Sequence, residues 1–240
     1  MMQRKRRVLI IIPAYNEEHT IGKVLYELTA VANKLGRDNI DLKILVIDDG
    51  STDRTVEIAK KYNVLIVSHL RNMGPGVAVR TGFLYAIKNN FDFIVRVDAD
   101  GQHPPNEIPK ILKPVLDGEA DVVIGSRFLH KTSYKMPFIK KLGIKIYSLV
   151  VLALTKKKII DLTSGFRAFN LKAVKTIVHS YPPDFPALKS TLTLIKSGLR
   201  VIEVPIKMNP RFKGRSYISG IKLLRYHLRA IKSVFEFLVS

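Results

Sequence analysis

The fold is decided by residues 93–105, FIVRVDADGQHPP, in which a short apolar run ends in a cluster of polar residues. Residues 93–97 have the β-branched and aromatic character of a strand, and Gly101 with two prolines supplies the turn that ends it. Asp98 and Asp100 therefore follow the carboxyl end of a predicted strand. In an open parallel α/β sheet that edge holds ligands, whereas in isolation the same residues are also compatible with a solvated turn.

The rest of the amino-terminal half alternates apolar runs with amphipathic segments. Apolar runs predict strands at 8–12, 44–47, 64–68, 93–97 and 122–124, and apolar residues at helical spacing predict helices at 20–35, 55–62, 77–89 and 105–116. Buried strands interleaved with helices are typical of a parallel sheet covered on both faces. We therefore expect an α/β fold with a mostly parallel sheet flanked by helices.

Composition limits the chemistry and the partners. The 240 residues include no cysteine, which excludes a disulfide scaffold, a thiol nucleophile and thiolate metal sites, and fits a reducing compartment. The chain has 40 Lys and Arg residues and 20 Asp and Glu residues, so its formal net charge is +20 and polyanions are the expected partners. Nucleic acid, anionic lipid and nucleotide phosphates all qualify.

The chain start, MMQRKRRVLIIIP, superficially resembles a signal peptide. Its apolar part, residues 8–12, is only five residues long before Pro13, and no small-residue cleavage site follows, so we interpret it as the first strand. No apolar run reaches the ~20 residues that span a bilayer. We expect a cytoplasmic protein.

Two later segments have the character of interfacial helices. Residues 134–158 contain the apolar stretch IYSLVVLAL between lysine pairs and triplets, and residues 217–240 place apolar side chains on one helical face with basic ones elsewhere. Either could instead pack on its own domain. Together, in a cationic chain, they favour peripheral association with the cytoplasmic face of a membrane, with a catalytic domain at 1–216 and a basic amphipathic helix at 217–240.

Polar clusters follow three of the predicted strands: PAYNE at 13–17, DDGSTD at 48–53 and DADGQHPP at 98–105. Each alone is a weak signal, because DDGSTD could be only an Asx turn and a helix cap. Successive strand ends of one parallel sheet converge on a common edge, however, and this convergence favours a site.

The third cluster has the chemistry of a metal site. Asp98 and Asp100 are two residues apart, so both side chains can point the same way on an extended backbone, and Gln102 adds another oxygen. Oxygen ligands suit Mg²⁺ or Mn²⁺, which also bind substrate phosphates and would neutralise a diphosphate leaving group. Zinc is disfavoured because cysteine is absent and the histidines lack ligand spacing.

The segment RNMGPGVAVRTG, residues 71–82, superficially suggests a dinucleotide fingerprint. After Gly74 and Gly76 the third glycine position is Val79, so the match fails. A Gly-rich turn that starts a helix competes with a role in shaping a nucleotide pocket.

The order of these motifs resembles that of the family-2 glycosyltransferases of the GT-A, Rossmann-like fold. Three further motifs continue the resemblance: GSR at 125–127, DLTSGFRAF at 161–169 and EVPIKMNPRFKGRS at 203–216. The likeness is greatest to dolichyl-phosphate mannose synthases and other polyprenyl-phosphate glycosyltransferases. It extends from Val8 to about Ser216. It implies transfer of mannose or glucose from GDP-mannose or UDP-glucose to a polyprenyl phosphate, with Mg²⁺ or Mn²⁺ as cofactor, and a membrane-anchoring partner subunit is possible.

The resemblance also implies roles for individual residues, with Asp100, Arg127 and Arg211 as the catalytic group. The nucleoside site would comprise Pro13, Tyr15, Glu17, Ile47 and Asp49; the metal and donor diphosphate site Asp98, Ala99, Asp100 and Gln102; the acceptor-phosphate site Arg127, Lys140 and Ser164; and the cations on the donor diphosphate Lys189 and Arg211.

Three features bear on the substrates. A phosphate monoester is already anionic and needs no general base, which suits a phosphate acceptor. The absence of Trp rules out the QxxRW motif of processive synthases. Tyr217 stands where mannose synthases carry Lys, and Gly101 where many of them carry Leu, so GDP-mannose, UDP-glucose and UDP-N-acetylglucosamine remain alternatives.

Alternative functions would require other sequence features. A transferase acting on a saccharide or protein hydroxyl needs a carboxylate base, for which Asp161 and Asp184 are the candidates. A nucleic-acid binder needs a basic face interleaved with aromatic residues, but the cations are spread over helices and the aromatic fraction is 8%. An inactive scaffold is disfavoured by the presence of Asp98, Asp100 and Arg211.

Overall fold

The computed structural model describes residues 4–36, 39–129, 138–183 and 186–210, without the side chains of residues 138–141. Its strands are β1 (Arg6–Ala14), β2 (Ile40–Asp48), β3 (Leu65–Ser68), β4 (Phe93–Arg96), β5 (Val122–Ser126), β6 (Arg167–Asn170) and β7 (Val201–Pro205). The helices are α1 (Ile21–Leu35), α2 (Thr55–Ala59), α3 (Pro75–Lys88), a 3-10 turn η2 (Pro105–Glu107), α4 (Ile108–Leu116), α5 (Phe138–Thr155), α6 (Leu171–Ile177) and α7 (Pro186–Lys196).

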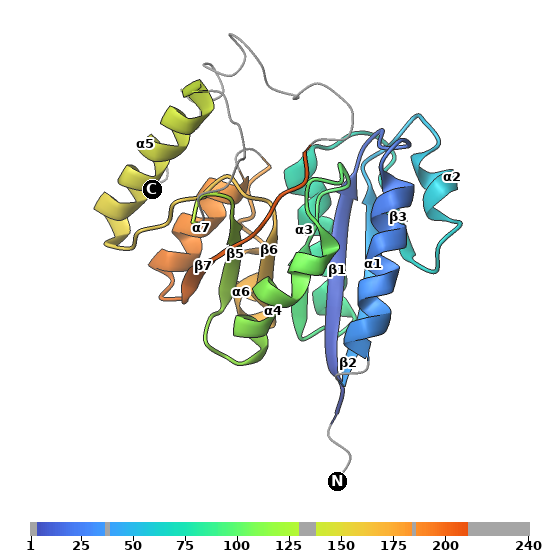
Figure 1. Ribbon diagram of the computed structural model, residues 1–240, viewed down its shortest axis with the longest axis horizontal. Coiled ribbons are helices and arrows are strands. Elements are labelled where there is room, and N and C mark those ends of the chain that lie inside the picture. The colour runs from blue at the N-terminus through green and yellow to red at the C-terminus, as the bar shows by residue number, and fades with distance from the viewer. Residues whose placement is uncertain (1–3, 37–38, 130–137, 184–185, 211–240) are drawn as a thin grey trace.

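The strands form a seven-stranded sheet in the order β3-β2-β1-β4-β6-β5-β7 (Figure 1). The pairs β1 with β2, β1 with β4, β2 with β3 and β5 with β7 are parallel, whereas β6 runs antiparallel to both β4 and β5. The prediction of a mostly parallel α/β sheet is confirmed. The register pairs Ala14 with Asp48 and Ile11 with Arg96, so β1, β2 and β4 end side by side.

Strand β1 is apolar on both faces because helices cover both. Leu9 and Ile11 pack into one core with α3, α6 and α7, and Ile10 and Ile12 pack into the other with α1 and α4. Successive side chains of a strand point to opposite faces, so a strand between two helical layers is a continuous apolar run. Helix α5 lies at the outer side of the carboxyl-terminal half (Figure 1).

The element boundaries follow the predicted ones with local differences. The predicted helix at 105–116 begins as the 3-10 turn η2, and α2 ends at Ala59 rather than at residue 62. The apolar segment within 134–158 forms α5, and none of the described helices is long and apolar enough to cross a membrane. The predicted helix at 217–240 lies outside the described residues.

Candidate functional site

The first two polar clusters are bound to each other by hydrogen bonds. The backbone N–H of Asn16 donates to Ser51 Oγ at 3.0 Å, and the N–H of Thr52 donates to Asn16 Oδ1 at 2.9 Å. One residue further on, the N–H of Glu17 donates to Thr55 Oγ1 at 2.8 Å. The DDGSTD segment therefore fixes the loop after β1 and lies next to the start of α2.

Asp49 anchors the connection between β3 and α3. Its Oδ1 accepts from His69 Nδ1 at 2.7 Å and from the N–H of Met73 at 3.0 Å, and its Oδ2 accepts from the N–H of Gly74 at 2.8 Å. The other ring nitrogen of His69 lies 2.9 Å from Thr81 Oγ1 on α3. The buried Asp49 thus holds the Gly-rich segment, which is a turn that starts α3 at Pro75.

The other residues matched to the nucleoside site differ in accessibility. Tyr15 is 42% exposed at the end of β1, and Pro13 is half-buried. Glu17 Oε2 accepts from Thr20 Oγ1 at 2.7 Å. The side chain of Ile47 is fully buried in the core beneath the sheet edge, because it faces the helical layer of α3. Tyr15 and Glu17 therefore lie where a nucleoside could reach them, and the side chain of Ile47 does not.

The DADGQ turn after β4 is fixed by hydrogen bonds with the side chains of Arg96 and His103. Arg96 Nε and Nη2 donate to Asp98 Oδ1 at 3.2 and 3.0 Å. The N–H of Asp98 donates to His103 Nδ1 at 2.9 Å, and the His103 ring stacks on Phe166 with centroids 4.9 Å apart. Asp100 Oδ1 accepts from the N–H of Gln102 at 3.0 Å, which closes the turn.

The charges of this turn depend on burial and on Arg96. Burial alone would raise the pKa of Asp98, but the neighbouring Arg96, with His103 and Arg127, outweighs it and holds that pKa below its ordinary value. Burial lowers the pKa of His103, against the attraction of Asp98 and Asp100, so its ring is neutral near pH 7. Since His103 Nδ1 accepts a hydrogen bond, its proton lies on Nε2.

The Arg127 side chain forms an ion pair with Asp161. Its Nε and Nη2 donate to the two carboxylate oxygens at 2.7 and 2.6 Å, and Nη2 also donates to Thr163 Oγ1 at 2.6 Å. Asp161 is fully buried, and Glu203 accepts from its backbone N–H at 2.7 Å. A buried, ion-paired carboxylate cannot serve as the base that a hydroxyl acceptor needs, so Asp161 is not a candidate for that role. Ser164 is buried next to this pair.

A pocket of about 190 Å³ opens beside the DADGQ turn. Arg96, Asp98 and Thr163 supply its polar groups, and the first turn of α7 closes the opposite side through Leu188. Lys189, matched to the donor diphosphate, is the next residue of α7 and is half-buried. The structure therefore brings Asp98 of the DADGQ turn, the 162–165 segment and α7 together around one space.

The segment after β7 is tied to the same turn. The N–H of Asn209 donates to the carbonyl of Gln102 at 3.0 Å, and Asn209 Nδ2 donates to the carbonyl of Gly101 at 3.2 Å. Arg211 and Asp184, and the side chain of Lys140, lie outside the described residues. Their predicted roles remain predictions.

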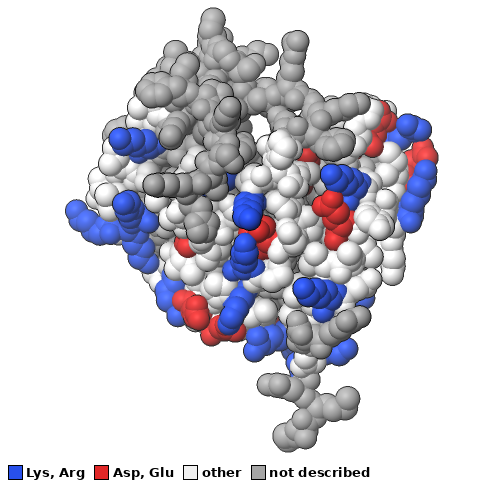
Figure 2. All heavy atoms as spheres, viewed as in Figure 1, with Lys and Arg blue, Asp and Glu red and all other residues white. Residues whose placement is uncertain are grey.

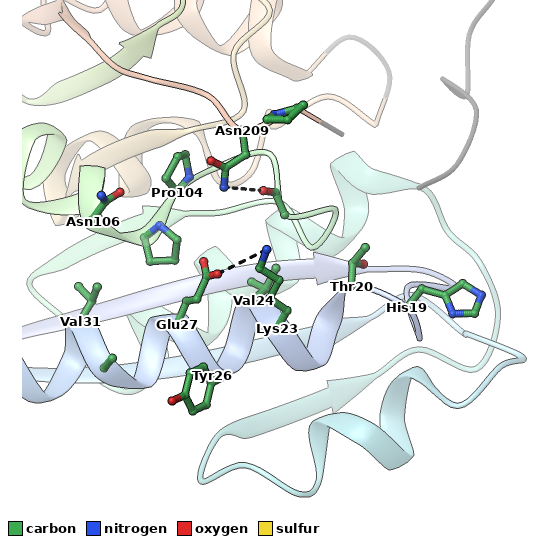
Figure 3. A pocket seen from close by; sticks show the side chains of 14 residues that line it. His19, Thr20, Lys23, Val24, Tyr26, Glu27, Val31, Pro104, Asn106 and Asn209 are labelled. Carbon is green, nitrogen blue, oxygen red and sulfur yellow. Dashed lines mark hydrogen bonds and ion pairs between the residues drawn. The ribbon is translucent and has the colours of Figure 1, made fainter. Parts of the chain in front are cut away.

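A wider groove of about 630 Å³ lies on the other side of Gly101, between α1 and residues 104–106 (Figure 3). Lys23 and Glu27 of α1 form an ion pair at 3.8 Å along it, and Asn209 lies across its upper edge. None of the described residues matched to the donor or the acceptor lines this groove, whereas Asp98 lines the smaller pocket.

The donor set of the DADGQ turn fits a hard divalent cation. Asp100 is partly exposed and Gln102 adjoins it, whereas Asp98 Oδ1 is occupied by Arg96. Within the described part of the chain no three His, Cys, Asp or Glu side chains form a metal cluster. A site with few protein ligands suits Mg²⁺ or Mn²⁺, which complete their shells with water and substrate phosphate, and does not suit zinc.

Arg96 and Thr163 were not among the predicted site residues, whereas His103 was expected to be a turn or hydrogen-bonding residue, as found. One signal was present for Arg96, since a charged residue interrupts an otherwise apolar strand, and buried charges are paired. The link between Arg127 and Asp161 spans 34 residues and has no local signal.

Figure 2 shows described Lys and Arg side chains over much of one face, several of them in a column from its centre downward, with Asp and Glu side chains beside them. Charges of both signs on this face do not by themselves indicate nucleic acid as the partner.

Comparison with known proteins assigns the family. A model described as Glycosyl transferase family 2 matches residues 9–178. The UDP-N-acetylglucosamine–dolichyl-phosphate N-acetylglucosaminyltransferase of Methanococcus voltae is 33% identical, covering 94% of this chain and 96% of that protein. The dolichol-phosphate mannosyltransferase of Pyrococcus furiosus is 34% identical over 92% of this chain and 61% of its own length.

Solved structures agree on the fold. Glucosyl-3-phosphoglycerate synthase of Mycobacterium tuberculosis, crystallised with Mn²⁺, UDP and glucosyl-3-phosphoglycerate, superimposes with a TM-score of 0.72 at 20% identity, covering 96% of this chain and 79% of that one. At that identity the likeness concerns the fold alone. The sheet order, the strand-end clusters and these matches lead to one assignment: the chain belongs to glycosyl transferase family 2 and has the GT-A fold.

Proposed function

We propose that the chain is an inverting, metal-dependent glycosyltransferase that moves one sugar from a nucleotide donor to a polyprenyl phosphate at a membrane surface. The observation that carries the proposal is the meeting of three polar strand-end clusters at one sheet edge, after the adjacent strands β2, β1 and β4. Two relatives with about a third of identical residues are named for sugar transfer to a dolichyl phosphate, which supports this acceptor class.

The metal would be held by Asp100 and Gln102 and would neutralise charge on the departing nucleoside diphosphate. The protein's part is to fix the turn. Hydrogen bonds with Arg96, His103 and Asn209 hold it, so its carboxylates would not need to reorganise when a donor binds. Arg211, two residues after Asn209, is proposed to close over the diphosphate.

A phosphate acceptor agrees with the ion pairing of the described carboxylates near the pocket. Among the described residues, the carboxylates around the 190 Å³ pocket are Asp98, bound to Arg96, and the neighbouring Asp161, bound to Arg127. An anionic phosphate oxygen can attack the sugar without losing a proton. Arg127, fixed by Asp161, would place positive charge near the acceptor phosphate.

Helix α5 offers a surface for the membrane. Leu142, Ile146 and Leu149 recur at helical spacing and are exposed, and the exposed Lys145 lies between them in the sequence. An apolar helix face edged by cations lowers its free energy at the interface of an anionic bilayer. This face, with residues 217–240 outside the described part, is our proposed contact with the cytoplasmic leaflet.

The donor remains among GDP-mannose, UDP-glucose and UDP-N-acetylglucosamine, because relatives of similar identity are named for mannose and for N-acetylglucosamine. The test is transfer of each radiolabelled sugar into an organic-extractable polyprenyl phosphate, with Mn²⁺ or with EDTA. Asp100→Asn should lower the rate by roughly a hundredfold. Asp117→Asn, at the end of α4, is the matched control and should retain the wild-type rate.

The outcomes separate the alternatives. Metal-dependent label in the lipid fraction that is lost in Asp100→Asn supports the proposal and identifies the donor. Donor hydrolysis without lipid labelling would favour an acceptor that is not a polyprenyl phosphate. No turnover of any of the three donors would contradict the transferase assignment.

A further inference from the structure

Three side chains, Asp49, His69 and Thr81, form a hydrogen-bonded series that the proposed reaction does not require. His69 Nδ1 lies 2.7 Å from Asp49 Oδ1, and His69 Nε2 lies 2.9 Å from Thr81 Oγ1. The side chains of Asp49 and His69 are only 4% and 14% exposed, and burial of such groups is costly unless they are hydrogen-bonded. One imidazole ring therefore joins the residue after β2, the residue after β3 and the middle of α3.

Thr81 fixes the orientation of the His69 ring. A carboxylate oxygen can only accept a hydrogen bond, so Nδ1 of His69 carries a proton and donates a hydrogen bond to Asp49. In the neutral ring Nε2 is then an acceptor for the Thr81 hydroxyl, and this second bond keeps the ring from turning. Asp49 is thus held by a ring whose two nitrogens both have partners.

Asp49 in turn holds the turn of residues 71–74. Its oxygens accept from the backbone N–H groups of Met73 at 3.0 Å and of Gly74 at 2.8 Å, directly before α3 begins. Gly74 has φ +91°, a conformation that glycine adopts readily and other residues rarely do. The carboxylate therefore holds the backbone of this turn in a defined shape, and His69 holds the carboxylate.

The turn lies at the sheet edge to which the nucleoside site was matched. Strands β1, β2 and β3 end in register, so the residues that follow them, Tyr15, Asp49 and His69, start at the same edge. Tyr15 is 42% exposed and residues 71–73 are exposed as well, whereas the Asp49 side chain is almost wholly buried. A ligand at this edge would therefore meet the turn, and Asp49 would act on the ligand through the shape of the turn.

We propose that His69 is a positioning residue for the nucleoside of the donor: it orients Asp49, and Asp49 holds the 71–74 turn as one side of the nucleoside site. The inference rests on the proposed function and deepens it. A turn that is already ordered spares a ligand the cost of ordering it. Without His69 this cost would weaken binding of the nucleoside, whereas the metal and the diphosphate, proposed to bind at the turn after β4, would not meet it.

The test separates the nucleoside from the diphosphate by calorimetric titration in Mn²⁺ with UDP, with GDP and with inorganic diphosphate, the last also measured by its displacement of the nucleotide. For whichever nucleotide binds the wild type, His69→Ala should weaken binding about tenfold and leave inorganic diphosphate within twofold. His69→Asn should be intermediate, because its amide can donate to Asp49 but cannot also bond to Thr81.

A double-mutant cycle tests whether Thr81 acts through His69. Thr81→Val should weaken the nucleotide about threefold, and Thr81→Ser, which keeps the hydroxyl, should bind as the wild type does. The double variant of His69→Ala with Thr81→Val should bind no more weakly than His69→Ala alone. Thr29→Val is the matched control: the Thr29 hydroxyl donates to the Leu25 carbonyl within its own helix, α1, at 2.8 Å, and its loss should leave all titrations unchanged.

Circular dichroism at the titration temperature identifies the variants that are folded. If His69→Ala is not folded, His69→Asn and Thr81→Val carry the same comparison.

Equal weakening of inorganic diphosphate and nucleotide would overturn the inference, and so would wild-type nucleotide affinity in the folded His69 and Thr81 variants. Both results would leave the proposed function intact. Additive losses in the cycle would overturn the part assigned to Thr81. If the wild type binds neither UDP nor GDP, the proposed function itself fails.

Discussion

Arg127 and Asp161 form a bidentate ion pair that joins the end of β5 to the segment before β6. Besides the two guanidinium hydrogen bonds, the backbone N–H of Arg127 donates to Asp161 Oδ2 at 2.9 Å. Asp161 has no exposed surface. The pair is therefore as much a structural clamp for the wall of the pocket as a source of positive charge.

Breaking this pair should destabilise the protein strongly. Asp161→Asn leaves the Arg127 guanidinium buried without its counter-charge, and we expect a loss of about 3 kcal/mol in the free energy of unfolding, measured by urea denaturation. Ser126→Ala is the control in the adjacent residue, because its buried Oγ has no hydrogen-bond partner among the described residues, and it should change stability by less than about 1 kcal/mol. A loss below about 1 kcal/mol in Asp161→Asn would show that the pair is not a clamp.

Gly50 of the DDGSTD segment should be intolerant of a side chain for two separable reasons. Its φ is +74°, a conformation that costs a residue with a Cβ about 1 kcal/mol, and a Cβ there would lie 2.5 Å from the Arg71 carbonyl carbon. Gly118 has φ +72° and no atom within 4 Å of its Cβ position. Gly118→Ala should therefore lose about 1 kcal/mol in urea denaturation, and Gly50→Ala more than about 2 kcal/mol. Equal losses would exclude a steric contribution at Gly50.

The part of the site that could be predicted from the sequence is the part built from local patterns. Apolar strands that end in Asp48, Asp98 or the PAYNE segment identify the ligand edge because parallel strands share that edge. Strand β6 was not predicted, since its four residues include Arg167, whose burial is compensated by hydrogen bonds to the carbonyls of Ser164 and Leu162 and to Thr191 Oγ1.

Contacts between distant segments could not be predicted in the same way. Asp49 fits the nucleoside site by its place in the sequence, but its hydrogen bonds go to residues 20 to 25 positions later, and these contacts exist only in the folded chain. Arg96 was visible as a charge in an apolar strand, while its partner became evident only when the turn after β4 folded back over it.

Acid should weaken the protein partly through Asp121. Burial would raise the pKa of this carboxyl group, but the hydrogen bonds from the N–H of Arg200 at 2.7 Å and from Asn170 Nδ2 at 2.8 Å outweigh it, so the pKa is lowered. A lowered pKa contributes stability above the unfolded-state value of about 3.9, and this stability is lost as the pH falls through the folded-state value.

Asp121→Asn removes this titration. The wild type should therefore lose more of its free energy of unfolding than Asp121→Asn does when urea denaturation is compared at pH 6 and at pH 3. At pH 6 the variant should be the less stable protein, and the difference should shrink in acid. A difference that stays constant between the two pH values would contradict the lowered pKa.

The exposed face of α5 should contribute to membrane binding and little to folding. Leu142 and Leu149 are 48% and 56% exposed, so replacing both by Gln removes few contacts within the protein. We expect the double variant to bind vesicles of mixed neutral and anionic phospholipid about tenfold more weakly in sedimentation, because each leucine would otherwise bury apolar surface in the interface.

Tyr26→Gln on α1 is the matched control, because it replaces an exposed apolar residue, 70% accessible, on a different helix, and it should bind vesicles as the wild type does. The midpoint of thermal unfolding should be unchanged in both variants, so that a loss of binding cannot come from unfolding. Wild-type binding by the Leu142 and Leu149 double variant would show that α5 does not contact lipid. A similar loss in Tyr26→Gln would place the contact on α1 as well and would require a different orientation of the pocket toward the bilayer.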